Sequence, residues 1–177
     1  RSIKLNTSPN ISIEVIVLAQ GLETEATIKN ITGIAFFLKD EIGFAKACNN
    51  VIPSTNGEYI CILNNDTLVL ENCLENLFSP FDQDSEIGIV CPKIIFGNGL
   101  LYEVGGVYLN NESFENEFSY KDPLVSAYNY RREVDYCSTI NLLFKKADFL
   151  TIQGFDENFN KLGQYFGHEN KDILKLK

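Results

Sequence analysis

CILNNDTLVLENC, residues 61–73, is the stretch on which the fold assignment depends. An apolar run at 59–63, YICIL, has the composition of a buried strand. It stops at three polar residues, Asn64-Asn65-Asp66. Ligands of parallel α/β sheets bind beyond the carboxyl ends of the strands. The stretch is therefore either the edge of a site or a plain turn, with Asp66 or Thr67 capping the helix that follows.

The sequence around this stretch alternates between strand and helix patterns. Apolar strand patterns lie at 11–18, 34–38 and 59–63, and helical patterns lie at 23–31, 44–52 and 69–78, the last ended by Ser79-Pro80. This order predicts crossover connections and a parallel sheet. Strand patterns at 87–96, 100–109 and 133–144 follow a turn at 97–99 or a long loop at 110–132, and a short helix is expected at 145–152. Because these strands lack long intervening helices, we expect a mostly parallel, partly mixed sheet in one domain, 1–177.

The composition excludes some classes of protein and partner. Fifteen basic and 24 acidic residues give a net charge of -9, which argues against a nucleic-acid partner. No apolar run has membrane-spanning length. The five cysteines form no CxxC motif, so we expect free thiols and a cytoplasmic location, including the cytoplasmic face of a membrane. The chain contains no Met and starts at Arg1, so we expect a segment of a longer chain with further domains.

Asn64 and Asp66 have the chemistry of half a metal site. In extended backbone, positions i and i+2 share a face, so an amide oxygen and a carboxylate would point the same way. Mg²⁺ and Mn²⁺ prefer such oxygen ligands, and Mg²⁺ takes much of its remaining shell from water and substrate phosphates. On the triplet alone, the turn is the favoured interpretation.

An ordered series of motifs changes that balance. The series consists of GFAKACN (43–49), NGEYICILNNDT (56–67), IGIVCPKIIF (87–96), EVGG (103–106), GFDENF (154–159) and FGHENKDILKLK (166–177). Each motif alone is weak, but in this order and spacing they resemble family 2 glycosyltransferases, in their rhamnosyltransferase-like branch. The resemblance implies a GT-A fold, which is a Rossmann-like three-layer sandwich. It also implies a nucleotide-sugar donor, a glycan or polysaccharide-precursor acceptor, as in cell-surface polysaccharide biosynthesis, and a divalent metal, Mg²⁺ or Mn²⁺.

The resemblance also assigns roles to residues. Asn64-Asn65-Asp66 falls on the family's DXD-like motif, so Asp66, with Asn64 as a weaker partner, would bind the metal, and Asn65 would lie beside the donor. Lys46 and Asn49 fall where the family faces the donor, although Lys46 is about equally consistent with a solvated helix lysine. Phe155, Asp156 and Glu157 fall on the acceptor-side turn, which is otherwise a structural turn. Inverting transfer needs a base, and the candidates are Glu169, Asn170 and Asp172. The single histidine, His168, is better explained as a loop residue without a catalytic role.

Three departures from the family pattern bear on activity. Ala19 and Gln20 stand where the family usually has a nucleotide-holding Asp, and the first βα unit is expected to be missing or to lie upstream. The presumed base position is Asn170, and an amide cannot take up a proton at neutral pH. Glu41 stands where the family often has Asn, which is a milder change.

Three functions therefore remain open. The first is a metal-dependent glycosyltransferase domain, truncated or part of a longer enzyme. The second is a degenerate, noncatalytic GT-A-like module that binds a sugar, a nucleotide or another domain. The third is a nucleotidyltransferase of related architecture, against which the GFDE and closing motifs count.

Overall fold

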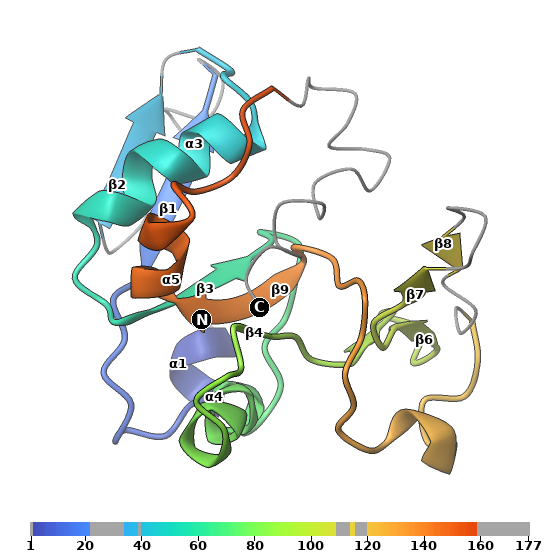
Figure 1. Ribbon diagram of the computed structural model, residues 1–177. Helices are drawn as coiled ribbons and strands as arrows, with labels where there is room; N and C mark the ends of the chain where they lie inside the picture. The colour runs from blue at the N-terminus through green and yellow to red at the C-terminus, as the bar shows by residue number, and fades with distance from the viewer. Residues whose placement is uncertain (1, 22–33, 39, 109–113, 116–119, 159–177) are drawn as a thin grey trace.

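A computed structural model describes residues 2–21, 34–38, 40–108, 114–115 and 120–158 of the chain. Figure 1 labels the elements. The helices are α1 (Ser2–Asn6), α3 (Phe44–Val51), η2 (Ile52–Ser54), α4 (Cys73–Gln83), η3 (Ser126–Tyr128) and α5 (Lys146–Thr151). The strands are β1 (Ile16–Gln20), β2 (Ile34–Leu38), β3 (Tyr59–Leu63), β4 (Ile89–Val90), β5 (Ile94–Ile95), β6 (Leu101–Glu103), β7 (Val107–Tyr108), β8 (Phe114–Glu115) and β9 (Asn141–Lys145).

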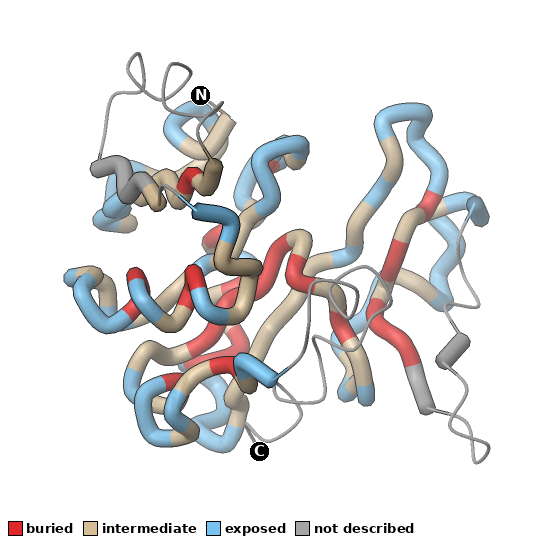
Figure 2. Tube along the Cα trace, turned by 90° about the horizontal axis from the view of Figure 1, so that it is seen from above, coloured by how far each residue is buried: buried red, intermediate tan, exposed pale blue. Residues whose placement is uncertain are grey.

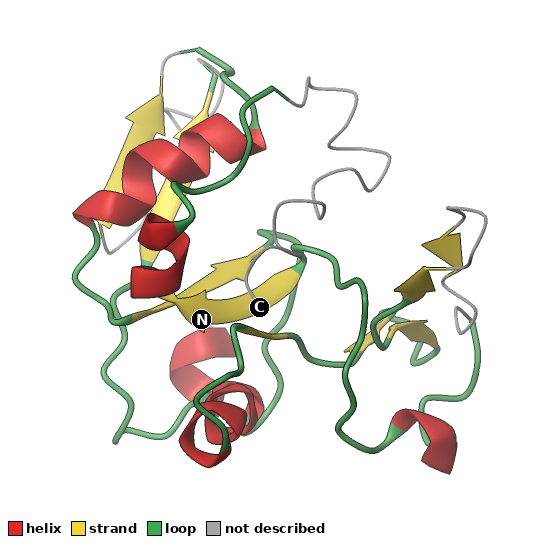
Figure 3. Ribbon diagram, in the orientation of Figure 1, coloured by secondary structure: helices red, strands yellow, loops and turns green. Residues whose placement is uncertain are grey.

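The central sheet is antiparallel and has the strand order β3-β9-β4. Among the described residues, only the β1–β2 pair is parallel, with Ile16 opposite Ile34. Two further antiparallel pairs, β5–β6 and β7–β8, lie on the right of Figure 3. The predicted mostly parallel sheet is therefore wrong for this part of the chain. The reason is β9, a distant segment that inserts in the antiparallel sense between β3 and β4.

Helices cover both faces of the β3-β9-β4 sheet, so the predicted layering of helices about a sheet is present. In Figure 1, α3 and α5 lie on one side of β9, and α1 and α4 lie on the other. Leu142 and Phe144 pack with the α3 and α5 side chains, whereas Leu143 packs with those of α4. Successive side chains of a strand point to opposite faces, and an entirely apolar strand is therefore expected where both faces are covered.

Burial is greatest along this central strand. Leu142, Leu143 and Phe144 are each at most 1% exposed. Figure 2 shows buried residues at the centre of the molecule and on the helices around it, with a further run on the right. Stacking of Phe144 on Phe149, with ring centroids 5.4 Å apart, extends the core from β9 into α5.

Several predicted elements are confirmed, with their ends adjusted. The strands at 34–38 and 59–63 match β2 and β3, the helix at 44–52 matches α3 to within one residue, and the helix at 145–152 matches α5. The turn at 97–99 is also present. The predicted strand at 11–18 begins only at Ile16, and the strand predicted at 133–144 is confined to β9. The predicted helix at 23–31 lies outside the described residues.

Pro residues explain the larger differences. The strand predicted at 87–96 is split into β4 and β5 around Pro92, which has no N–H to donate to a sheet ladder. The helix predicted to end at Ser79-Pro80 instead runs to Gln83 with Pro80 inside it. Leu74, Leu77 and Phe81 recur at helical spacing and are all buried, so core packing outweighs the backbone hydrogen bond that Pro80 cannot make.

Each sheet presents an edge without a strand partner in the described ranges. β1 pairs with β2 alone, and β3 pairs with β9 alone. The expected absence of a first βα unit stays a prediction, as does the assignment of residues 1–177 to a single domain. The described part of the loop predicted at 110–132 contains β8 and η3. Within the described ranges, no helix combines the length and the apolar character that a membrane crossing requires.

Candidate functional site

The Asn64-Asn65-Asp66 segment forms an exposed turn directly after β3. The Thr67 N–H donates to the Asn64 carbonyl at 3.2 Å, and the Asn64 N–H donates to the Ile140 carbonyl at 3.0 Å. The side chains of all three residues are exposed. The premise that Asn64 and Asp66 continue the strand is wrong, because β3 ends at Leu63. The roles expected for Asn64, Asn65 and Asp66 toward metal and donor stay predictions.

Tyr102 of β6 is close enough to this turn for the charge of Asp66 to act on its hydroxyl. The pKa of its hydroxyl is raised, mainly by burial and to a smaller extent by Glu103, Tyr120 and, least of all, Asp66. An electrostatic effect of Asp66 on Tyr102 places the two side chains in one neighbourhood. The sequence did not distinguish Tyr102 from a core aromatic residue, since nothing in LLYEVGG indicates which face of the strand meets the turn.

The donor chemistry of this turn suits a hard cation only in part. Asp66 supplies one carboxylate, and Asn64 and Asn65 add amide oxygens on the same exposed turn. Within the described residues, no group of three or more His, Cys, Asp or Glu side chains is arranged to hold a metal ion. A single protein carboxylate is enough for an ion that takes its other ligands from water and phosphate oxygens, which is the usual arrangement for Mg²⁺.

Asn49 joins the expected donor side to the expected acceptor side. Its side-chain oxygen accepts from the Phe155 N–H at 2.8 Å, and its Nδ2 donates to the Phe155 carbonyl at 2.8 Å. The same Nδ2 donates to Glu157 Oε1 at 2.9 Å. Asn49 thus fixes the backbone of the GFDE turn against α3. Its expected donor contact stays a prediction beside this structural role.

The GFDE turn depends on glycine at its first position. Gly154 has φ +81°, and a Cβ built there would lie 2.3 Å from the Asn49 side-chain oxygen. Phe155 is buried and packs against Phe44 and Phe149, with ring centroids 5.5 and 5.3 Å away. Asp156 accepts hydrogen bonds from Asn158 through its Oδ1, which stabilises the next turn. The close approach of this turn to α3 explains the glycine that begins the motif.

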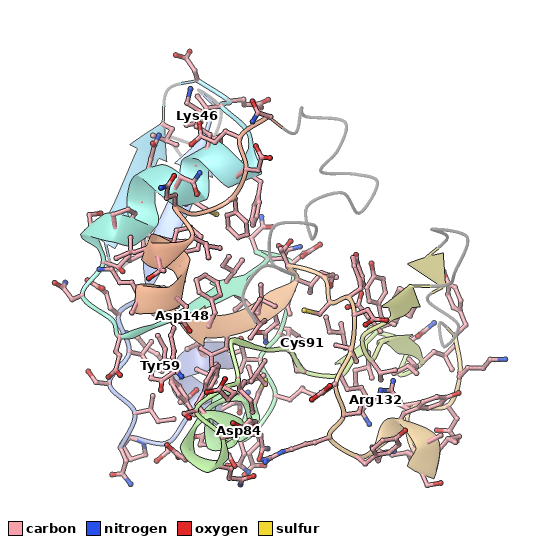
Figure 4. The ribbon with its side chains drawn as sticks, in the orientation of Figure 1. Lys46, Tyr59, Asp84, Cys91, Arg132 and Asp148 are labelled. Carbon is pink, nitrogen blue, oxygen red and sulfur yellow. The ribbon has the colours of Figure 1, made fainter. Side chains whose placement is uncertain are left out.

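The remaining predicted site residues are not brought to the Asp66 turn by any described contact. Lys46 is exposed on the surface of α3 (Figure 4). Glu169, Asn170 and Asp172, the candidates for the base, lie outside the described residues, as does His168. Their roles stay predictions.

Glu103 is a buried carboxylate to which the sequence patterns assign no role. It is 4% exposed, and its Oε1 accepts from the Ser138 N–H at 2.8 Å. Burial raises the pKa of this carboxyl, and the Ser138 N–H opposes that rise. A glutamate inside the apolar run LLYEVGGVYL was the available signal. The hydrogen bond from Ser138 to Glu103 connects β6 to the segment that leads into β9. Ile140, two residues further along that segment, accepts the hydrogen bond from Asn64 of the Asp66 turn.

The rest of the EVGG motif packs on the same segment. Gly105 has φ +80°, and a Cβ there would meet Val134 Cγ1 at 2.5 Å. The Gly106 N–H donates to the Tyr136 carbonyl at 2.9 Å, and the Asp135 N–H donates back to the Gly106 carbonyl at 3.0 Å. Gly105 therefore lets the chain after β6 approach the 134–138 segment closely.

Replacing Asn49 tests the junction between α3 and the GFDE turn. Asn49→Ala removes three hydrogen bonds and leaves polar atoms of Phe155 without their partner. We expect the free energy of unfolding to fall by about 1–3 kcal/mol in urea denaturation. Asn50→Ala, at the exposed neighbouring position, is the matched control and should change it by less than about 0.5 kcal/mol. Equal effects of the two variants would contradict the role given to Asn49.

Replacing Glu103 tests its burial through pH dependence. Because folding raises the pKa of this carboxyl, its favourable contribution is complete below the ordinary glutamate pKa and is lost as pH rises through the folded value. Glu103→Gln has no charge to bury, so its stability relative to the unaltered protein should increase between pH 4 and pH 8. Urea denaturation across that range measures the difference, with exposed Glu133→Gln as the control. A difference that does not vary with pH would contradict the account.

Two comparisons with known proteins bear on the identity of the chain. A search of curated proteins found no match. The family described as Glycosyl transferase family 2 matches residues 1–148. The matched range includes α3, β3, the Asp66 turn, Glu103 and β9, so it covers the candidate site except for the GFDE turn and the closing motif. The chain therefore belongs to glycosyl transferase family 2.

Proposed function

We propose that this chain transfers a sugar from a nucleotide-sugar donor to a hydroxyl group of a glycan or polysaccharide-precursor acceptor, with inversion at the anomeric carbon. Membership of family 2 indicates glycosyl transfer from a nucleotide sugar. The observation that most supports the proposed donor site is the exposed turn at the carboxyl end of β3. There Asp66 is accessible, and the turn is held by a hydrogen bond between Asn64 and Ile140.

The residues of this turn would bind the diphosphate part of the donor. Asp66, with Asn64 as the weaker ligand, would hold a Mg²⁺ or Mn²⁺ ion. When bound, that ion supplies positive charge against the diphosphate leaving group. Asn65, and Lys46 on α3, are the further donor contacts in this proposal. Tyr102 would line the side of the turn that faces β6.

The acceptor side is formed by the GFDE turn in this proposal. Asn49 positions Phe155 and Glu157, and Asp156 is partly exposed beside them. A carboxylate would take the proton from the acceptor hydroxyl as its oxygen attacks the anomeric carbon. Since Asn170 cannot do this, Glu169 or Asp172 would act instead. We also propose a cytoplasmic location, supported by five cysteines that form no disulfide in the structure.

One observation favours the noncatalytic alternative. Gln20 stands where the family usually has a nucleotide-holding Asp, and its Oε1 accepts from the Ile42 N–H at 3.0 Å. That oxygen therefore stabilises the segment before α3, and Ala19 beside it is buried. A module that binds a nucleotide or sugar without transferring it would share the Asp66 turn and lack only the chemical step.

Donor binding is tested by thermal stability. We expect Mn²⁺ together with a nucleoside diphosphate at millimolar concentration to raise Tm, because a ligand that binds only the folded state stabilises it. The panel is UDP, GDP, CDP and dTDP, each with and without Mn²⁺. Asp66→Asn should abolish the metal-dependent rise, and Asp82→Asn, an exposed carboxylate on α4, should retain it. If none of the four diphosphates gives a metal-dependent rise in Tm, the proposal that this chain binds the donor is overturned.

Sugar transfer separates the enzyme from the noncatalytic module. If Glu169 or Asp172 serves as a weak base, Asn170→Asp should increase turnover at least tenfold by restoring a carboxylate, as general base catalysis contributes about 10²–10⁴-fold. Turnover is followed as nucleoside diphosphate released from the donor that shows binding. A wild-type chain that transfers sugar and gains nothing from Asn170→Asp would show that the base is misassigned. Metal-dependent binding with no transfer by either form would support the module.

A further inference from the structure

Cys91 and Cys137 form a thiol pair at the junction between the central sheet and β6. Cys91 directly follows β4, and Cys137 lies four residues before β9. The two side chains share a hydrogen bond, which together with burial raises the pKa of the Cys137 thiol. Cys137 belongs to the core cluster that contains Leu142 and Phe144, and Cys91 packs against that cluster. Figure 4 shows Cys91 where the chain leaves β4 toward the β6 side of the molecule.

A second pair in the same protein provides a built-in comparison. Cys61 of β3 and Cys73 of α4 are separated by the buried amide of Asn141. The Cys61 thiol donates to Asn141 Oδ1 at 3.3 Å, and Asn141 Nδ2 contacts Cys73 Sγ at 3.8 Å. Because an amide group lies between these sulfur atoms, they cannot bond without displacing Asn141. The Cys137 and Cys91 side chains instead share a direct hydrogen bond.

We propose that Cys91 and Cys137 are a redox modification site, which small disulfides such as oxidised glutathione convert to an intramolecular disulfide. The two thiols differ in exposure, as expected for a site with one accessible thiol and one resolving thiol. Cys91 is partly exposed, whereas Cys137 is only 8% exposed. An incoming disulfide therefore reacts with Cys91 first, and Cys137 then displaces glutathione from the mixed disulfide.

The thiol–disulfide exchange proceeds in two steps. The Cys91 thiolate attacks one sulfur of oxidised glutathione, which forms a mixed disulfide and releases one glutathione thiolate. Cys137 then loses its proton and attacks the Cys91 sulfur, which expels the second glutathione thiolate. The two protons lost by the protein end on the two glutathione molecules. The protein thiols are oxidised by two electrons, and one glutathione disulfide is reduced.

The location gives this bond a structural consequence. The segment that begins at Cys137 continues through Ser138, whose N–H donates to Glu103, to Ile140, whose carbonyl accepts from Asn64. A disulfide would therefore tie the end of β4 to the segment that supports the Asp66 turn. The cross-link lies beside the candidate site and uses none of the residues assigned to donor, metal or acceptor.

The test uses the full chain, reduced and then treated with oxidised glutathione. Denaturation, alkylation of the remaining thiols and peptide mass spectrometry identify the linkage. We expect two of the five thiols to be lost and the linked peptides to contain Cys91 and Cys137. Cys137→Ala should accumulate glutathione on Cys91, because the resolving thiol is absent. Cys73→Ala, which removes one member of the separated pair, should still form the Cys91–Cys137 bond.

Three results would overturn the proposal. The first is a chain in which all five thiols remain open to alkylation after treatment. The second is a disulfide that maps to Cys61 and Cys73 in place of the expected pair. The third is glutathione that stays on Cys91 while Cys137 is present. Each is read directly from the peptide masses and does not depend on enzymatic activity.

Discussion

Burial of β9 on both faces is the constraint on which the rest of the structure depends. Its side chains fill the core on the α3 and α5 side through Leu142 and Phe144, and the core on the α4 side through Leu143. Removing apolar side chains from water is the main favourable contribution to folding. A strand covered on both faces buries the apolar side chains of both faces. The antiparallel pairing of β9 with β3 also fixes what lies beyond β3. Because Leu63 pairs with Asn141, the Ile140 carbonyl is positioned to accept from Asn64.

The candidate site is built outward from this core by a few polar contacts. On one side, Ile140 supports the Asn64–Thr67 turn, and Glu103 accepts from Ser138 two residues earlier. On the other side, Asn49 holds the backbone of Phe155, whose ring is itself part of the β9 core. Both halves of the candidate site therefore rest on the packed unit around β9. A buried, hydrogen-bonded scaffold with exposed loops is how α/β proteins hold binding residues in place.

Local patterns predicted the elements whose signals lie within a few residues. The apolar run at 59–63 and the apolar spacing in FAKACNNV each match an observed element. The antiparallel insertion of β9 was not predictable, since no local pattern in NLLFK specifies its partners or its direction. The packing of Leu77 and Phe81 likewise carried a helix past Pro80, where a local rule predicted its end. Tertiary packing decided both cases.

The site was predictable in its position and less so in its geometry. The change from YICIL to NND placed a polar turn at the end of a strand, as observed, but the extended backbone assumed for Asn64 and Asp66 is replaced by a turn. The burial of Glu103 and the Asn49 contacts depend on residues 35 and 106 positions away. Spacing along the chain carries no information on such contacts.

The central claim is that the Asp66 turn is the metal and diphosphate edge of the molecule. Paramagnetic broadening of backbone amide signals by Mn²⁺, in the presence of a nucleoside diphosphate, tests it most directly. The account predicts that the amides of residues 64–67 and of Tyr102 broaden first, and that Asp66→Asn removes the effect. Broadening centred on the exposed acidic residues Asp82, Asp84 and Glu86, with residues 64–67 unaffected, would contradict it.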